Sequence, residues 1–331
     1  MSRHLLEVGL GTIGLVAIGF IALAAPASAA PASLQPEGAE LARDEPEAVD
    51  APRVAWNDAW PRFRTSEAIV TGAMLLPIAG ALFLYPHPDD NLHGGFLFDN
   101  AVRDALVLGD ESARTRAASL SNLPYFGLLA FPLLVDTALV TAGIHRAGDV
   151  ALEMLAMDLE SYAITGAISL SFQKLGRVRP SEKGCATDPN YASQCDNPVG
   201  LNQSFLSGHT SVAFTGAGLT CAHHRHLPLY GGGWPDVAIC VASLAAASST
   251  GVLRVMSDNH YASDVLLGVG VGLVSGWVLP EWLHYGGGGE GTGEARRSGG
   301  LLPTFGGEGW RALVAPQFSG GALGLTLIAR H

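Results

Sequence analysis

Residues 254–264 read Arg254-Val255-Met256-Ser257-Asp258-Asn259-His260-Tyr261-Ala262-Ser263-Asp264. The stretch places a histidine six residues after an arginine and an aspartate four residues after that histidine. If its second half is helical, as the apolar run from Val265 indicates, His260 and Asp264 lie on one helix face, one turn apart. Asp264 would then accept the Nδ1 proton of His260 and leave Nε2 as a free lone pair. The alternative interpretation is an ordinary surface His–Asp pair.

Two earlier motifs favour the first interpretation. They are Arg177-Val178-Arg179-Pro180, and Ser207-Gly208-His209 at the start of a helix-like apolar run. Arg-x-Arg-Pro, then Ser-Gly-His, then Arg-x5-His-x3-Asp resembles the three-part signature of the type 2 phosphatidic acid phosphatase superfamily. That superfamily includes lipid phosphatases, bacterial acid phosphatases and vanadium haloperoxidases. Each motif alone is weak evidence, but all three occur in the right order, and the resemblance extends over about residues 69–280.

The resemblance implies a role for each motif residue. His260 would attack phosphorus and form a phosphohistidine, with its tautomer fixed by Asp264. His209 would protonate the leaving group and then activate water. The phosphate cradle would comprise Arg179 and Arg254, whose guanidinium groups match phosphate geometry, together with Ser207 and the Gly208 N–H at a helix N-terminus. No metal is required in this scheme because the arginines supply the charge, and vanadate is expected to inhibit.

The first motif departs from the usual pattern. The superfamily usually has a lysine seven residues before Arg179, where this chain has Phe172, and the nearest lysine is Lys174. Two residues along a helix correspond to a rotation of about 200°, so Lys174 would face away unless the helix has already ended. Arg177 is a candidate third phosphate contact or, alternatively, a plain surface residue.

Composition restricts the class of partner. The 331 residues carry a net charge of −11, which argues against nucleic acid as a partner. Hydrophobic residues make up 48% of the chain and charged residues 15%, which is apolar for a soluble protein. The expected partner is a phosphorylated small molecule or lipid, with possible membrane association.

The chain divides into five regions by composition. We expect a signal peptide at 1–30, a disordered leader at 31–60, a helical-bundle domain at 61–285, a Gly-rich linker at 286–309 and a C-terminal β-hairpin at 310–331. The fold class is all-α, with about six core helices. They are predicted at 69–85, 123–144, 150–172, 211–221, 237–253 and 264–279, with an amphipathic helix at 99–108.

These helices suit a buried core better than membrane spans. A spanning helix needs about 20 largely uncharged residues, yet 150–172 contains Glu153, Asp158 and Glu160, and 123–144 contains Asp136. We therefore expect an exported protein on the periplasmic side, with an integral membrane protein as the alternative.

Cysteines and histidines outside the motifs have simpler expected roles. Cys185 and Cys195 lie ten residues apart in a polar loop, which favours a disulfide over free thiols. Cys221 and Cys240 lie in apolar helices and are expected to be buried thiols. The tract at 223–226, His-His-Arg-His, follows a predicted helix end and is expected to be a solvated cationic cap and not a metal site.

The sequence thus predicts a metal-independent phosphatase that hydrolyses phosphate esters, with lipid phosphates and isoprenoid pyrophosphates favoured by the apolar surroundings. One alternative is a vanadium-dependent haloperoxidase, in which vanadate is a cofactor and not an inhibitor. A second is a catalytically weak protein that binds anionic head groups, motivated by the displaced lysine.

Overall fold

The computed structural model describes residues 54–84, 92–185, 187–195 and 198–286, and strands at 304–305, 311–319 and 322–330. The predicted signal peptide, most of the leader and nearly all of the Gly-rich linker lie outside these residues. Trp56 and Val54 are each 7% exposed and pack in one core cluster with Leu227 and Tyr285. The last residues of the predicted leader therefore contribute two buried apolar side chains to this cluster.

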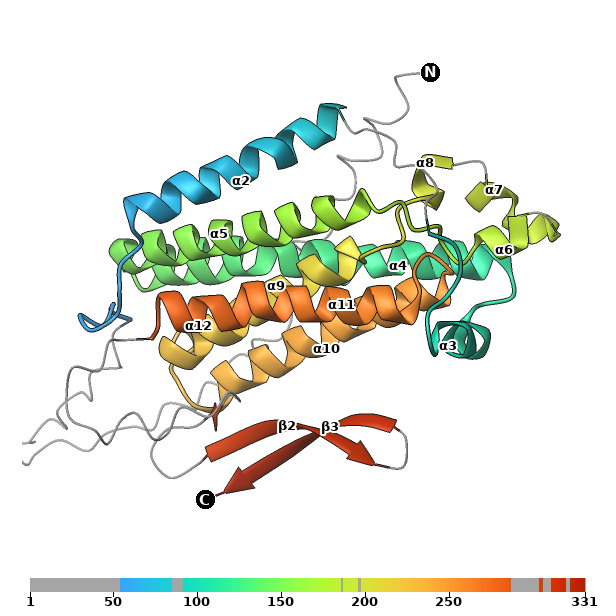
Figure 1. The fold of residues 1–331 in the computed structure, drawn as a ribbon. Coiled ribbons are helices and arrows are strands. Elements are labelled where there is room, and N and C mark those ends of the chain that lie inside the picture. Colours follow the sequence, from blue (N-terminus) through green and yellow to red (C-terminus); the bar gives the residue numbers. More distant parts are fainter. Residues whose placement is uncertain are drawn as a thin grey trace, which may run out of the picture. The chain divides into compact units, whose positions relative to one another are not determined.

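The all-α prediction is confirmed, and every predicted helical segment is a helix (Figure 1). The long elements are α2 (Thr65–Leu84), α3 (Asp99–Leu106), α4 (Glu111–Ala130) continued by a π-helix (Phe131–Ile144), α5 (Gly148–Gln173), α9 (Gly208–His226), α10 (Trp234–Met256), and α11 (Ala262–Leu273) continued by a second π-helix (Val274–Val278) and α12 (Leu279–Leu283). Short helices α6 (Glu182–Cys185), α7 (Ala192–Cys195) and α8 (Pro198–Leu201) and a 3₁₀ turn (Pro189–Tyr191) fill the segment between α5 and α9.

Helix α9 is the centre of the bundle and packs against α4, α5, α10 and α11 (Figure 1). Glycine makes the closest of these contacts possible. A Cβ atom on Gly216 would lie 2.0 Å from the carbonyl oxygen of Leu128 in α4. On the second π-helix, a Cβ on Gly276 would lie 2.1 Å from the carbonyl oxygen of Thr215 in α9. The backbone of α9 therefore lies in direct contact with the backbones of α4 and of the second π-helix. These contacts fix the position of α9 relative to both neighbours.

Three helical stretches are long and apolar enough to cross a membrane: Glu111–Ile144, Trp234–Met256 and Ala262–Leu283. Of the 18 most apolar consecutive residues in each stretch, only 33%, 33% and 28% are buried inside the protein. Large apolar side chains are exposed along them, among them Leu123, Leu134, Leu139, Val241, Val252, Leu266, Leu267 and Val278. The expectation that these helices form a buried core is wrong, because much of their apolar surface faces outward.

Three of the four carboxylates that argued against membrane spans are turned inward, whereas Glu153 contacts Arg62 at 3.1 Å. Asp136, Asp158 and Glu160 are buried and lie next to His224 Nε2 at 3.2 Å, His223 Nε2 at 2.9 Å and His284 Nε2 at 2.8 Å. Ionisable groups that pair inside a bundle are compatible with a helix that crosses a bilayer. The predicted solvated cap at 223–226 is wrong for its first two residues, because His223 and His224 are buried in these pairs.

The remaining pieces are a second disulfide and a small sheet. Cys221 of α9 and Cys240 of α10 are buried as expected, but they form a disulfide and are not thiols. At the C-terminus β2 (Arg311–Ser319) pairs antiparallel with β3 (Ala322–Arg330), with Ser319 opposite Ala322. A two-residue strand, β1 (Thr304–Phe305), adds to the other edge of β2.

Candidate active site

Residues of all three motifs converge at one end of the bundle. His209 is the second residue of α9, Arg254 lies in the last turn of α10, and His260 lies two residues before α11. Arg179 follows α5 in the chain. Burial together with the charges of Arg254 and Arg179 holds the pKa of His260 well below its usual value, and the same three causes act on His209. Both arginines thus lie near both histidines, and His260 and Arg254 of this group are buried.

His260 is oriented by a backbone carbonyl and not by Asp264. Its Nδ1 atom lies 2.7 Å from the carbonyl oxygen of Ser204, which can only accept, so Nδ1 carries the proton. Nε2 is left with the lone pair. The predicted contact with Asp264 fails because α11 begins at Ala262, so His260 precedes the helix and does not share a face with Asp264.

Asp264 instead holds the backbone that surrounds His260. Its Oδ2 atom accepts hydrogen bonds from Ser204 Oγ at 2.6 Å and from the Tyr261 N–H at 2.9 Å. The second contact caps the N-terminus of α11, and Arg177 pairs with the other carboxylate oxygen. Asp264 therefore acts on His260 through Ser204, whose hydroxyl it binds and whose carbonyl holds the imidazole.

Arg177 is a buried structural residue. Its side chain is fully buried between the rings of Phe96 and Tyr261, at 4.2 and 4.4 Å from their centroids. Its Nη2 atom lies 2.8 Å from Asp99 Oδ2, and its Nη1 atom binds Asp264. The expectation that Arg177 contacts phosphate, and the alternative that it lies on the surface, are both wrong because two buried carboxylates occupy it.

Arg179 and Arg254 differ from Arg177 in having no carboxylate partner. Within the described part of the chain neither forms an ion pair, and the Nε atom of each is buried without a hydrogen-bond partner. Arg179 makes one side-chain contact, from Nη1 to Asn259 Oδ1 at 2.6 Å. Burial lowers the pKa of Arg179 to about 10, which leaves it charged at neutral pH. Two neighbouring cations whose Nε atoms are buried, and which have no ion-pair partner among the described residues, form a site for an anion.

His209 faces the same cluster from the first turn of α9. Its Nε2 atom lies 3.1 Å from Asn122 Oδ1, and its ring lies 4.4 Å from that of Tyr125. Burial, Arg254 and Arg179 lower its pKa to about 3, so His209 is neutral at neutral pH. With Nε2 next to an amide oxygen, Nδ1 is the atom left to exchange a proton.

The N-terminus of α9 forms another wall of the cluster. Ser207 is its buried N-cap, with Oγ 2.9 Å from Thr210 Oγ1, and its own N–H donates to the Asp264 carbonyl at 3.2 Å. A Cβ on Gly208 would lie 3.7 Å from Gln173 Nε2, the last residue of α5. Lys174 follows immediately, outside the helix and exposed to solvent. The helix thus ends before Lys174, and the side chain nearest Gly208 is the amide of Gln173.

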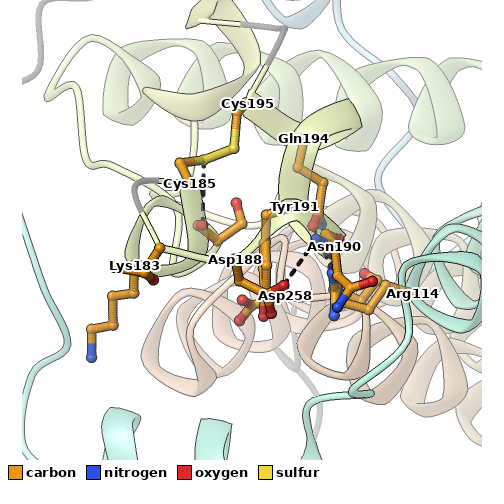
Figure 2. Close-up of a disulfide and its surroundings, with 12 residues drawn as sticks. Arg114, Lys183, Cys185, Asp188, Asn190, Tyr191, Gln194, Cys195 and Asp258 are labelled. Carbon is orange, nitrogen blue, oxygen red and sulfur yellow. Dashed lines mark hydrogen bonds between the residues drawn. A yellow bond between two sulfur atoms is a disulfide. The ribbon is translucent and has the colours of Figure 1, made fainter.

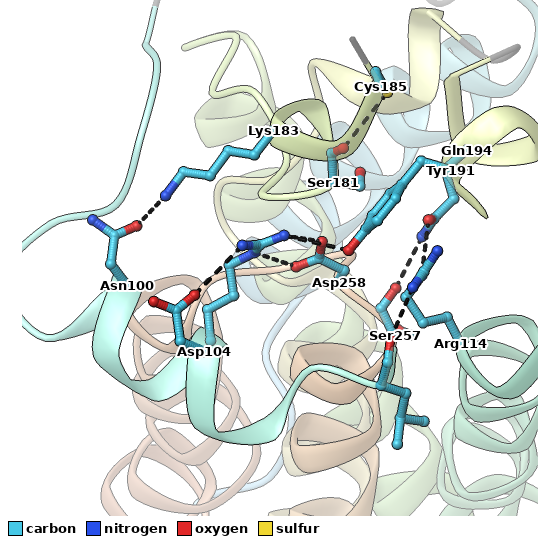
Figure 3. A network of polar contacts seen from close by, with 12 residues as sticks. Asn100, Asp104, Arg114, Ser181, Lys183, Cys185, Tyr191, Gln194, Ser257 and Asp258 are labelled. Atoms are coloured by element: carbon cyan, nitrogen blue, oxygen red, sulfur yellow. Dashed lines mark hydrogen bonds and ion pairs between the residues drawn. The ribbon is translucent and has the colours of Figure 1, made fainter. Parts of the chain in front are cut away.

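A disulfide-closed segment packs against the turn that precedes His260. Cys185 and Cys195 form the expected disulfide (Figure 2). The residues between them contact Arg103 of α3, Arg114 of α4 and Ser257 of the turn. Arg103 of α3 forms two hydrogen bonds with Asp258, from Nε at 2.7 Å and from Nη2 at 2.6 Å. Gln194 donates to the Ser257 carbonyl at 3.0 Å, as Figure 3 shows. Asp258 is fully buried at φ +59°, so these contacts hold a backbone conformation that is rare outside glycine.

We expect the double substitution Cys185→Ser with Cys195→Ser to lower the free energy of unfolding by about 2–3 kcal/mol, because a ten-residue cross-link restricts the unfolded chain. Denaturant unfolding of both forms in the same detergent measures the difference. Turnover should fall at temperatures where the bundle is still folded, since the segment holds the turn at 257–258. Equal stability and equal turnover in the two forms would contradict this role.

The segment that carries the motifs can now be compared with known proteins. Residues 151–287, which contain all three motifs, match the profile of the PAP2 superfamily. This segment is therefore similar to the PAP2 superfamily. It is 29% identical over 209 residues to a lipid A 1-phosphatase from Porphyromonas gingivalis, a match that covers 63% of this chain and 37% of that protein. No solved structure gives a significant match.

Several residues of this site were not predicted from the sequence. They are Asp99, Asn122, Gln173, Ser204 and Asn259, which support the motif residues through the contacts described above. Asn122 lies immediately before the apolar helix predicted at 123–144. The described residues contain no group of three or more His, Cys, Asp or Glu side chains placed to hold a metal ion.

Proposed function

We propose that this protein hydrolyses phosphate esters without a metal ion, through a phosphohistidine at His260. The observation that carries the proposal is the pair of guanidinium groups of Arg179 and Arg254, whose Nε atoms are buried without a partner and which form no ion pair among the described residues, next to two neutral histidines. A phosphate dianion would supply the missing negative charge and the missing hydrogen-bond acceptors. The proposal accounts for why two unpaired cations are retained in a buried position.

The chemistry has two displacements. In the first, the Nε2 lone pair of His260 attacks phosphorus, the bond to the ester oxygen breaks, and protonated His209 gives its proton to that oxygen. In the second, neutral His209 takes a proton from water while the water oxygen attacks phosphorus and the P–Nε2 bond breaks. Arg179 and Arg254 stabilise the charge on the phosphoryl oxygens in both steps, so the protein supplies an acid, a base and a fixed positive field.

His209 must acquire its proton when substrate binds. Burial and the two arginines lower its pKa to about 3. A bound dianion offsets the charge of the arginines and raises the pKa of His209 towards neutrality. The site therefore takes up a proton together with the substrate, which makes the acid available only when a phosphate ester is present.

The proposed substrate is a lipid phosphate on the outer side of a membrane. Support comes from the outward-facing apolar helices, from the PAP2 relative whose name gives lipid A 1-phosphate as its substrate, and from two disulfides, which favour an oxidising compartment. Isoprenoid pyrophosphates offer the same combination of anionic group and apolar tail. A panel of both substrate types, with p-nitrophenyl phosphate as a soluble reference, tests this assignment.

Vanadate is expected to inhibit turnover of p-nitrophenyl phosphate, while EDTA is expected to have no effect. Vanadate adopts the five-coordinate geometry of the phosphoryl transition state, and the arginines replace metal ions as the source of positive charge. Steady-state rates with each reagent provide the measurement. Activity that disappears in EDTA and returns with a divalent metal would contradict the proposal, and bromide oxidation with peroxide after vanadate loading would favour a haloperoxidase.

A further inference from the structure

A group of exposed apolar side chains lies beside the active site and takes no part in the chemistry. We call it the apolar rim: it comprises Leu92, Phe96, Leu97, Phe98, Phe172 and Leu175, which are between 38% and 97% exposed. Residues 92–98 read Leu-His-Gly-Gly-Phe-Leu-Phe and contain no Asp, Glu, Lys or Arg. Leu97 is 97% exposed and has φ +47°, an unfavourable backbone conformation for leucine.

The rim is continuous and adjoins the cradle. The Leu92 N–H donates to the Gly176 carbonyl at 3.2 Å, which joins the two chain segments of the rim. Phe172 packs against Phe205 with ring centroids 5.5 Å apart, and Phe205 lies two residues before the N-cap of α9. Exposed apolar side chains therefore extend from residues 92–98 to the edge of the phosphate site.

The buried residues Asp99 and Arg177 hold the rim in place on its inner side. Asp99 accepts from the Phe96 N–H at 2.8 Å, and Arg177 donates to the Gly94 carbonyl at 3.1 Å while lying under the Phe96 ring. A segment anchored by buried charges on its inner side presents its leucine and phenylalanine side chains outward in a fixed arrangement. Fixed exposure of this kind is costly in water and indicates an apolar partner.

The length of α10 favours a lipid bilayer as that partner. A 23-residue helix is about 35 Å long and matches a hydrocarbon core of about 30 Å. Arg254 lies in its last turn, so the cradle lies at the level of the lipid phosphates if α10 spans the bilayer. We propose that the apolar rim inserts into the interfacial layer of a phospholipid bilayer and holds the cradle at the depth of the headgroups. The inference rests on the membrane setting proposed above, but not on the catalytic mechanism.

Spin-label accessibility tests the insertion directly. All four cysteines are in disulfides, so Leu97→Cys introduces a single free thiol. In phosphatidylcholine vesicles we expect a label at 97 to be accessible to oxygen and protected from a water-soluble nickel complex, like a label at Val241→Cys, which is half-exposed on α10. Asp104→Cys is the matched control, since its side chain is 71% exposed on the adjoining helix α3 and should remain accessible to nickel.

Any other pattern of oxygen and nickel accessibility would contradict insertion of the rim into the bilayer. Equal nickel access at 97 and 104 would place the rim in water, and shielding of 97 from both reagents would mean that protein covers it. Nickel access at 241 would show that α10 does not span, and the membrane setting itself would fail. Phosphohistidine formation is not involved in any of these readouts, so failure of the proposed chemistry would be seen separately.

A kinetic consequence follows for the full-length protein. Leu97→Asp should lower hydrolysis of phosphatidic acid in phosphatidylcholine vesicles about tenfold or more, because a charged residue at the tip opposes insertion. Hydrolysis of p-nitrophenyl phosphate in detergent should remain unchanged, and Leu97→Met should behave as the native protein does. An equal loss on both substrates would show that residue 97 acts on folding or on the site itself, and would contradict the role of the rim.

Discussion

Replacing His260 with alanine is expected to abolish turnover of p-nitrophenyl phosphate. His260 is the only histidine of the cluster whose Nδ1 is committed to a backbone carbonyl, at 2.7 Å, so that Nε2 is a lone pair directed away from that contact. Its pKa lies well below the usual value, so the nucleophilic form dominates at neutral pH. Removing a nucleophile leaves only the contribution of the anion site, as in other enzymes with a covalent intermediate.

The matched control for this prediction is His93→Ala. His93 is about half exposed, and its ring contacts Glu182 at 3.2 Å. Its replacement should leave turnover within a small factor of the native rate. Near-native turnover by His260→Ala, with His93→Ala unchanged, would remove His260 from the nucleophile role.

Arg254→Ala is expected to lower kcat by about 10²–10³-fold, equivalent to about 2.7–4 kcal/mol of transition-state stabilisation. Arg254 has no carboxylate partner among the described residues, so its removal should leave no unpaired buried charge and little loss of stability. Arg225→Ala, in the last turn of α9 and 3.5 Å from Glu281, is the matched control and should preserve turnover. Large loss of stability together with activity would mean that Arg254 is structural.

Arg177→Ala should mainly lower the stability of the protein, whereas Arg254→Ala should mainly lower kcat. Its removal leaves Asp99 and Asp264 buried without their cation, a change that typically costs 3–5 kcal/mol of stability. Thermal unfolding alongside steady-state kinetics separates the two arginines. Arg177→Ala with native stability and a selective loss of kcat would restore the phosphate-binding role that the sequence suggested.

The motifs predicted which residues meet but not how they contact one another. Spacing identifies His260 and Asp264 as neighbours, yet the start of α11 at Ala262 determines that Asp264 caps the helix and binds Ser204. Arg177 and Arg179 are two residues apart and chemically identical. Only their tertiary surroundings separate the two: Arg177 pairs with two carboxylates, and Arg179 forms no ion pair among the described residues.

The helices themselves were predictable because their apolar runs are long and end at Gly, Pro or charged residues. Their environment was not. The sequence shows Asp136 and Asp158 within apolar segments, but the direction of each side chain depends on which helix packs beside it. Single polar residues such as Ser204 give no signal in a sequence, because their function is carried by a backbone carbonyl that every residue has.

The most direct test of the central claim is the position of the covalent phosphoryl group. Brief reaction with ³²P-labelled phosphatidic acid, followed by alkaline quench, digestion and mass spectrometry, locates the modified peptide under conditions that preserve phosphohistidine. The mechanism predicts label on His260, none in His260→Ala, and slower loss of label in His209→Ala because water is no longer activated. Label on His209, or turnover without any label in the native protein, would contradict it.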